Sequence, residues 1–391
     1  MSITLAKRLD RWVGAAWARG LGAWDGLCEA VRTPAPVEEV RRLLVIKLWG
    51  VGNWALLRPV VRDLRERHPS ARLTVLTLAG NRPLVEDLAD EVLLVRPAPL
   101  AAAALDLARA AWRLRRDPPD LALDFEPFAH AGALVARLGR AAQRVGFARA
   151  GRARDRLYTV TVPMRGEAHV ARSFRDLAEA AGVLPGPYEP GHLQPSAAGR
   201  AQVEALGLPA AQGLALVHPG SGDNFPGRRW SEAGFAAVAR TLAGEGLCVL
   251  VTGDASEAAL CQRVAAAAGA DVRSVAGLLG LEGLVALVAR ARLLASNDTG
   301  PVHLASALGV STLALYGPNT PRLYGPLAPG SRAFYRALPC SPCLTADSHR
   351  SSRCRIFTCM ASIPVGEVAE AARRLARQHG TAHAASGGAG A

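Results

Sequence analysis

The sequence is poor in aromatic residues and contains no long apolar run. Only 5% of its residues are aromatic, which argues against surfaces that stack nucleic-acid bases, and no motif that reads RNA or DNA is present. No apolar stretch reaches the roughly 18 residues that a transmembrane helix needs. The N-terminus lacks the layout of a signal peptide, and the seven cysteines, an odd number, argue against a secreted disulfide framework. We therefore expect a cytoplasmic protein that does not bind nucleic acid.

The chain is long, apolar and basic. It has 391 residues, of which 50% are hydrophobic, and single cores rarely exceed about 250–300 residues, so two domains are expected. The net charge of +13 suits anionic partners such as nucleotide diphosphates, phosphorylated glycolipids or acidic membrane surfaces.

Short apolar runs alternate with helical patterns along most of the chain, which predicts parallel, doubly wound sheets of the α/β class. The expected strands are 43–46, 73–77, 91–95, 121–124 and 144–147, then 214–218, 247–252, 272–275, 292–296 and 312–316. The expected helices are 54–67, 84–88, 101–115, 129–138 and 170–181, then 232–243, 257–268, 281–289, 301–308 and 365–377. A stretch rich in glycine and proline at 182–191 is the predicted linker, which gives domains at 43–190 and 191–363.

The two ends of the chain are predicted to be appendages. Residues 1–42 carry tryptophans and basic residues at helical spacing. This pattern suits a helix on the inner face of a membrane, and a helix packed on the domain surface is the alternative. In 364–391, a helix is predicted to cross back to the first domain, and the small polar residues from His379 onward predict a disordered tail.

A turn near residue 298 organises the second domain. The apolar run 291–295 predicts a buried strand, and 304–309 predicts a helix that ends at a glycine. Between them Thr299 suits the N-cap and Pro301 the first helical position. A strand-to-helix turn of this kind presents bare N–H groups and the positive end of a helix dipole, which favours a phosphate or diphosphate.

The residues of this turn carry a family resemblance. The run DTGPVHLASALGVSTLALYGP, which begins at Asp298, resembles the nucleotide-sugar signature of family 9 glycosyltransferases, the heptosyltransferase-like enzymes. The resemblance implies the GT-B fold, two Rossmann-like domains facing a cleft. It also implies that Asp298, Thr299, Gly300 and His303 hold the donor's diphosphate. The alternative is a capped helix in which His303 faces the core.

Two further turns of the second domain follow the same family. The stretch from His218 to Trp230 resembles the family's opening HPGS and basic-Trp motif, which implies that Ser221 and Arg228 lie at the donor phosphates. Arginine grips a diphosphate with two parallel hydrogen bonds. The family's next turn supplies an acidic residue to the nucleoside, and that residue is Glu257 here. The alternatives are a solvated basic loop and a glutamate that only stabilises a helix start.

The glycine loop of the first domain departs from the family. In heptosyltransferases this acceptor-side loop, Gly50 and Gly52 here, is followed by an aspartate that acts as the base, and this sequence has Asn53. An amide cannot take a proton, so another carboxylate must serve, or the chain binds without turnover. Asp124 and Glu126 follow a predicted strand and are the candidate replacements, with Glu126 preferred. Capping of the next helix by Glu126 is the alternative.

Cysteines and arginines form two other clusters. Cys340, Cys343, Cys354 and Cys359 fit either reduced thiols or a structural metal. A basic stretch predicts either a site for acidic lipid or a phosphorylated acceptor, or a solvated loop. Its members are Arg137, Arg140, Arg144, Arg149, Arg152, Arg154 and Arg156.

Together these features predict a metal-independent, inverting glycosyltransferase without a cofactor. It is expected to move heptose or a related sugar from a nucleotide-diphosphate donor to a lipid- or polysaccharide-linked acceptor in cell-envelope synthesis, and to be peripheral to the inner face of the plasma membrane. The alternatives are a non-catalytic nucleotide-sugar-binding or accessory protein, and a GT-B sugar epimerase or hydrolase.

Overall fold

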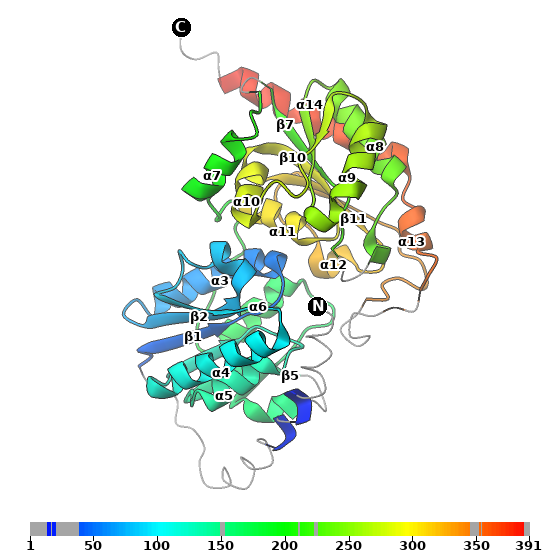
Figure 1. Ribbon diagram of the computed structural model, residues 1–391. Helices are drawn as coiled ribbons and strands as arrows, with labels where there is room; N and C mark the ends of the chain where they lie inside the picture. The colour runs from blue at the N-terminus through cyan, green and yellow to red at the C-terminus, as the bar shows by residue number, and fades with distance from the viewer. Residues whose placement is uncertain are drawn as a thin grey trace. The chain divides into compact units, whose positions relative to one another are not determined.

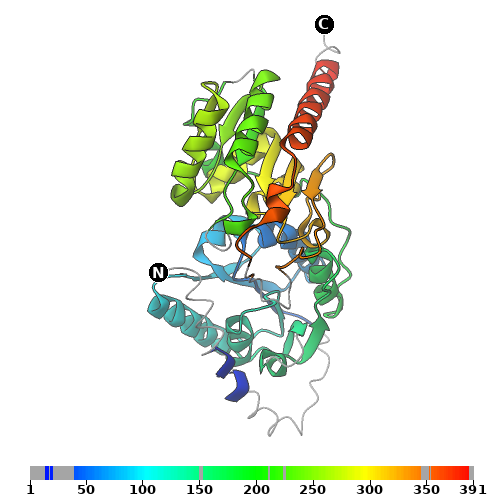
Figure 2. The same cartoon turned by 90° about the vertical axis from the view of Figure 1, so that its right-hand side faces the viewer.

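A computed structural model describes residues 14–16, 18–20, 39–148, 153–209, 212–222, 226–344, 352 and 354–386, without the side chains of 226 and 379–386. The chain divides into two compact units, Met1–Tyr188 and Glu189–Ala391 (Figure 1). Each unit contains one parallel sheet of six strands with helices on both faces (Figures 1 and 2). These are the two doubly wound, parallel-sheet domains that the sequence predicts.

The first sheet has the strand order β3-β2-β1-β4-β5-β6. Its strands are β1 (Arg42–Ile46), β2 (Arg72–Leu78), β3 (Glu91–Val95), β4 (Leu121–Asp124), β5 (Gln143–Ala148) and β6 (Val160–Pro163). Its helices are α3 (Val51–Arg67), η3 (Ala79–Leu84), α4 (Leu100–Arg116), α5 (Ala131–Leu138), η4 (Ala153–Leu157) and α6 (Val170–Glu179). Helices α4 and α5 pack together, as do α3 and α6.

The second sheet repeats this topology with the order β12-β11-β10-β7-β8-β9. Its strands are β7 (Leu214–His218), β8 (Cys248–Val251), β9 (Val272–Ser274), β10 (Ala291–Asn297), β11 (Ser311–Tyr316) and β12 (Arg332–Tyr335). Its helices are α7 (Ala197–Glu204), η5 (Pro226–Arg228), α8 (Glu232–Gly244), η6 (Ala255–Glu257), α9 (Ala258–Ala268), α10 (Leu281–Arg290), α11 (Gly300–Leu308), α12 (Pro321–Tyr324), α13 (Thr358–Ala361) and α14 (Val365–Ser386).

Each sheet reverses its winding between two central strands. The reversal lies between β1 and β4 in the first unit and between β7 and β10 in the second. In open parallel sheets, ligands bind at the carboxyl ends of the strands beside such a reversal, because the loops there diverge to opposite faces. The loops after these four strands therefore hold the candidate site residues except Glu257, which follows β8.

The ends of the chain differ from the sequence-based expectation. The helix predicted at 365–377 lies within α14, which packs on α8, β10 and β11 of its own unit, because Val368, Ala372 and Leu375 enter that unit's core. It also extends through Ser386, so the predicted disordered tail does not begin at His379. Near the N-terminus, Ala18 is buried with Ala133, Leu157 and Tyr158, while most of residues 1–38 lie outside the described part. No helix in the described ranges is long and apolar enough to cross a membrane.

Candidate functional site

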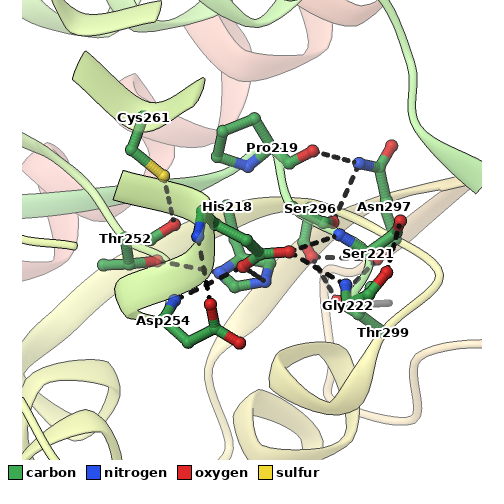
Figure 3. Close-up of polar contacts among 12 residues, drawn as sticks. His218, Pro219, Ser221, Gly222, Thr252, Asp254, Cys261, Ser296, Asn297 and Thr299 are labelled. Carbon is green, nitrogen blue, oxygen red and sulfur yellow. Dashed lines mark hydrogen bonds and ion pairs between the residues drawn. The ribbon is translucent and has the colours of Figure 1, made fainter. Parts of the chain in front are cut away.

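Two neighbouring loops form the candidate donor site of the second unit. Strands β7 and β10 pair in parallel, with Ser296 opposite His218. The loop that begins at Pro219 and the turn at Thr299 therefore leave the sheet side by side (Figure 3). These are the two stretches that the family resemblance assigns to the donor phosphates.

The buried side chain of Asn297 joins the two loops. Its Nδ2 donates to the carbonyl oxygens of Pro219 at 2.8 Å and Gly220 at 3.1 Å, and its Oδ1 accepts from the N–H of Trp230 at 2.9 Å. Three buried polar groups are thereby satisfied by one amide. This role of Asn297 was not predicted, because its three partners lie far away in the chain.

The turn after β10 leaves main-chain donors available. Thr299 is the N-cap of α11, as predicted, but its side chain makes no capping hydrogen bond. Its Oγ1 donates instead to the carbonyl of Asn297 at 3.2 Å and lies 3.0 Å from Ser296 Oγ. Among the described residues, no hydrogen bond uses the main-chain N–H of Thr299 or Gly300. Two amides at the positive end of α11 thus remain available for an anion.

Arg228 lies between the same two loops. Its Nη1 donates to the carbonyl of Asp298 at 2.9 Å, and its Nη2 donates to the carbonyl of Ser221 at 3.0 Å. The buried Asp298 carboxylate lies 3.8 Å from Nη1 and accepts from Asn319 Nδ2 at 2.9 Å. A guanidinium has five N–H donors, so Arg228 keeps donors for a further anion. Asn319 holds Asp298 in place, a role that the sequence analysis missed.

Glu257 lies at the start of a helix, as in the alternative interpretation of the sequence, and its carboxylate also contacts the loop after β7. Its buried Oε1 accepts from the N–H groups of Ser221 and Gly222, both at 2.9 Å. Its Oε2 accepts from the N–H of Asp254, with which it forms a capping box. The carboxylate therefore braces the loop after β7 and occupies two amides that an anion would otherwise use.

Gly220 is required for this brace. A Cβ atom at Gly220 would lie 2.1 Å from Glu257 Oε1. We expect Gly220→Ala to destabilise the protein by about 1–3 kcal/mol, because the buried carboxylate must move away from its donors. Gly244→Ala is the matched control, because a Cβ there meets nothing within 4 Å. Urea unfolding of both variants measures the difference, and equal stabilities would contradict the brace.

His218 and His303 are both buried at this end of the sheet. His218 Nδ1 lies 3.2 Å from Thr252 Oγ1, and burial lowers the pKa of His218. His303 lies on the first turn of α11, and its ring centroid is 6.2 Å from that of Tyr324. The second unit thus brings the predicted residues Ser221, Arg228, Asp298, Thr299, Gly300 and His303 to one edge of its sheet.

In the first unit, Glu126 is a buried partner of the glycine loop. Its Oε1 forms an ion pair with Lys47 Nζ, both side chains being 2% exposed, and accepts from the N–H of Trp49 at 2.8 Å. Trp49 directly precedes Gly50, and Lys47 lies two residues before Trp49. In this arrangement Glu126 fixes the loop after β1, and its carboxylate is paired with a buried cation.

Asp124 belongs to a second buried network. It accepts hydrogen bonds from Tyr158 Oη at 2.7 Å and from the N–H of Glu126 at 2.9 Å, and Arg154 Nη2 lies 3.6 Å from its Oδ2. Burial outweighs the guanidinium and raises the pKa of Asp124 to about 6. A Cβ at Gly132 would lie 2.5 Å from the same Oδ2. Like Glu126, Asp124 is enclosed by the protein.

The raised pKa of Asp124 predicts a pH-dependent stability. Since the folded protein holds this proton more tightly than the unfolded chain, the stabilisation is complete below about pH 4 and is lost as the pH rises through about 6. We expect Asp124→Asn to reduce this change of the free energy of unfolding with pH by at most about 3 kcal/mol. Urea unfolding across this range, with wild type as the reference, measures it, and parallel pH profiles for the two proteins would rule it out.

Asn53 is the polar side chain at the start of α3. It is half-buried in the first turn, and no hydrogen bond of its side chain occurs within the described ranges. Gly50, the N-cap, has a φ of +93°, and a Cβ there would lie 2.8 Å from Asn53 Nδ2. Gly52 is buried in the same turn. The glycine loop therefore folds closely around the position where the family carries its base.

The cysteines do not form a metal centre in the described part of the chain. Cys340 and Cys354 are exposed, and Cys359 is buried. No group of three or more side chains among the described histidines, cysteines, aspartates and glutamates is placed to hold a metal ion. Residues 345–351 and 353 of this loop, and Cys28, lie outside that part.

Part of the predicted basic stretch is structural. Arg144 and Arg154 are buried, and they donate to main-chain carbonyls of Leu157 at 2.7 Å and Ala129 at 2.6 Å, respectively. These two guanidiniums therefore tie loops together and do not form an anion-binding surface. Arg149 and Arg152 lie outside the described residues.

Comparison with known proteins identifies the family. The model of glycosyltransferase family 9 (heptosyltransferase) matches residues 107–352, more than half of the chain. The chain belongs to this family. It is 29% identical over 307 residues to lipopolysaccharide heptosyltransferase 2 of Salmonella typhimurium, an alignment that covers 75% of this chain and 87% of that protein.

Two solved structures share the fold of this family 9 chain. E. coli ADP-heptose LPS heptosyltransferase II has a TM-score of 0.70 at 24% identity, over 86% of this chain and 99% of that one. The glycosyl transferase family 9 protein of Veillonella parvula has a TM-score of 0.73 at 22% identity, over 89% and 100%. The predicted family and GT-B fold are confirmed, and the chain is a glycosyltransferase.

Proposed function

We propose that this glycosyltransferase moves heptose from ADP-heptose to a sugar hydroxyl of a lipopolysaccharide core, at the cytoplasmic side of the inner membrane. The observation that carries the proposal is the start of α11, where two free amides lie beside Arg228 in a chain of family 9. The names of the relatives supply the donor and the class of acceptor.

The second unit is assigned to the donor. As the bond between the anomeric carbon and the diphosphate oxygen breaks, its electron pair moves onto the leaving ADP. The amides of Thr299 and Gly300 and the guanidinium of Arg228 stabilise that charge, and they do so without a metal ion. The acceptor oxygen bonds to the opposite face of the anomeric carbon, which inverts its configuration, and the acceptor's proton passes to a base.

The first unit is assigned to the acceptor. Glu126 is paired with Lys47, and Asp124 is enclosed by Tyr158 and Arg154. With Asn53 in place of the family aspartate, this arrangement favours a second candidate, a protein that binds the nucleotide sugar without transferring it.

A transfer assay separates the two candidates. The full chain is incubated with ADP-heptose and a lipopolysaccharide core that lacks its outer heptose, with and without a chelator. The proposal predicts that the mass of the lipopolysaccharide core increases by one heptose and that ADP is released only when the acceptor is present. The chelator should not change the rate of transfer. Donor binding without either product would replace the proposal by the binding candidate. Release of ADP without acceptor would indicate a hydrolase.

A further inference from the structure

We propose that the outward face of α4 docks on an anionic lipid surface. We call the exposed side chains Leu105, Arg109, Trp112, Arg115 and Arg116, together with Leu138 and Arg140 at the end of α5, the α4 face. Figures 1 and 2 both show α4 on the outside of the first unit, with no described helix or strand beyond it. The proposal does not depend on the transferase activity.

Apolar side chains follow the exposed side of α4 from Ala101 to Trp112. Ala101, Ala104, Leu105, Ala108 and Trp112 are all exposed, and their spacing of three or four residues places them on one side of the helix. Trp112 is 56% exposed and Leu105 47% exposed, while the opposite side of α4 buries Ala110, Ala111 and Leu114. A helix of a soluble domain that packs on one side normally presents polar residues on the other.

The end of α5 extends this face. Helix α5 packs against α4, and a Cβ at Gly139 would lie 2.8 Å from Leu114 Cβ, so the last turns of the two helices lie together. Leu138 is 38% exposed, and Arg140 is also exposed. The apolar surface therefore widens where the basic residues are most frequent.

The charge of the α4 face is positive and largely uncompensated. The Arg116 guanidinium lies 3.6 Å from the centroid of the Trp112 ring. No ion pair joins Arg115 or Arg116 to an acidic side chain in the described ranges. Arg109 lies 3.9 Å from Asp106, but Asp106 pairs more closely with Arg96, at 2.7 Å. The chain as a whole carries +13.

This combination fits a membrane interface better than a protein partner. Tryptophan concentrates at the boundary between headgroups and acyl chains, and arginine extends its charge to the headgroups while its stem stays in apolar surroundings. Each basic residue near an anionic surface adds attraction, which salt screens. A second copy of the chain would bring the arginines of two such faces together. Charge complementarity therefore selects anionic lipid as the occupant.

The test uses flotation of the full chain with vesicles of phosphatidylglycerol and phosphatidylethanolamine, and with phosphatidylcholine vesicles for comparison. We expect binding to the anionic vesicles that weakens as salt is added. The Leu105→Ser/Trp112→Ser variant should bind about 10-fold more weakly, and Arg115→Glu/Arg116→Glu about 100-fold more weakly. Leu278→Ser, which changes an exposed leucine of the second unit, is the matched control and should bind as wild type does.

A second readout locates the contact. Brominated lipids should quench the tryptophan fluorescence of wild type more than that of Trp112→Phe. The thermal unfolding temperature and the affinity for ADP show that each variant is folded, because both should equal those of wild type. If both double variants bind the anionic vesicles as tightly as wild type does, the proposal is overturned and the lipid contact lies elsewhere, such as in residues 1–38. The proposal is also overturned if wild type does not bind vesicles but forms a dimer that the double variants cannot form. That result would assign the α4 face to a second copy of the chain.

Discussion

Replacing Arg228 by alanine lowers the affinity for ADP by about 10- to 100-fold, the range expected when a charge-assisted hydrogen bond to a phosphate is lost. Arg228 already bridges the carbonyls of Ser221 and Asp298, at 3.0 and 2.9 Å. Its removal therefore takes away a cation and also loosens the turn that presents the Thr299 and Gly300 amides. Both effects weaken the same site, which is why we expect a large loss.

Isothermal titration calorimetry with ADP measures this loss. Arg263→Ala is the matched control, because Arg263 lies in the same unit but pairs at the surface with Glu232 at 2.7 Å. The Arg263→Ala variant should bind ADP with the affinity of wild type. Arg228→Lys keeps the charge without the planar pair of donors and should fall between the two. An Arg228→Ala variant that is folded and binds ADP as tightly as wild type would remove Arg228 from the site.

Replacing Asn53 by aspartate raises the turnover number by about 100-fold, the lower end of what a positioned base contributes. Asn53 lies in the first turn of α3, where the helix dipole favours a carboxylate and no hydrogen bond occupies the side chain in the described part of the chain. The change of an amide to an acid hardly alters the volume, so the surrounding glycine loop should keep its fold.

The turnover number of Asn53→Asp is measured at saturating ADP-heptose and acceptor and compared with that of Asn53→Ala. We expect slow turnover in wild type and Asn53→Ala, rapid turnover in Asn53→Asp, and the same affinity for ADP in all three. If the aspartate variant is as slow as the alanine variant, position 53 is not where the acceptor's proton goes.

The fold followed from the sequence because buried parallel strands are continuous apolar runs. The predicted strands 91–95, 121–124 and 214–218 match β3, β4 and β7 to the residue. The edge strands β6 and β12 were missed, because their exposed positions break the apolar run. The helix predicted at 84–88 is wrong: η3 ends at Leu84, since Pro83 lies within this 3₁₀ helix.

The site followed from the sequence only in part. A strand end and an N-cap are local signals, so the turn at Thr299 and its neighbour Arg228 were predicted together. The roles of Glu257 and Glu126 depend on partners far away in the chain, namely Ser221 and Lys47. In the sequence, a glutamate that accepts hydrogen bonds from buried donors cannot be distinguished from a glutamate that faces a substrate. The amides Asn297 and Asn319 were missed for the same reason.

Amide NMR of the full chain, labelled with ¹⁵N-glycine and ¹⁵N-threonine, tests the donor site most directly. The account predicts that the resonances of Thr299 and Gly300 shift on addition of ADP, with the same midpoint as calorimetry, because their N–H groups bind the diphosphate. Gly222, whose N–H donates to Glu257 at 2.9 Å, should shift less. Saturation with ADP that leaves the Thr299 and Gly300 resonances in place would contradict the assignment of the diphosphate to the start of α11.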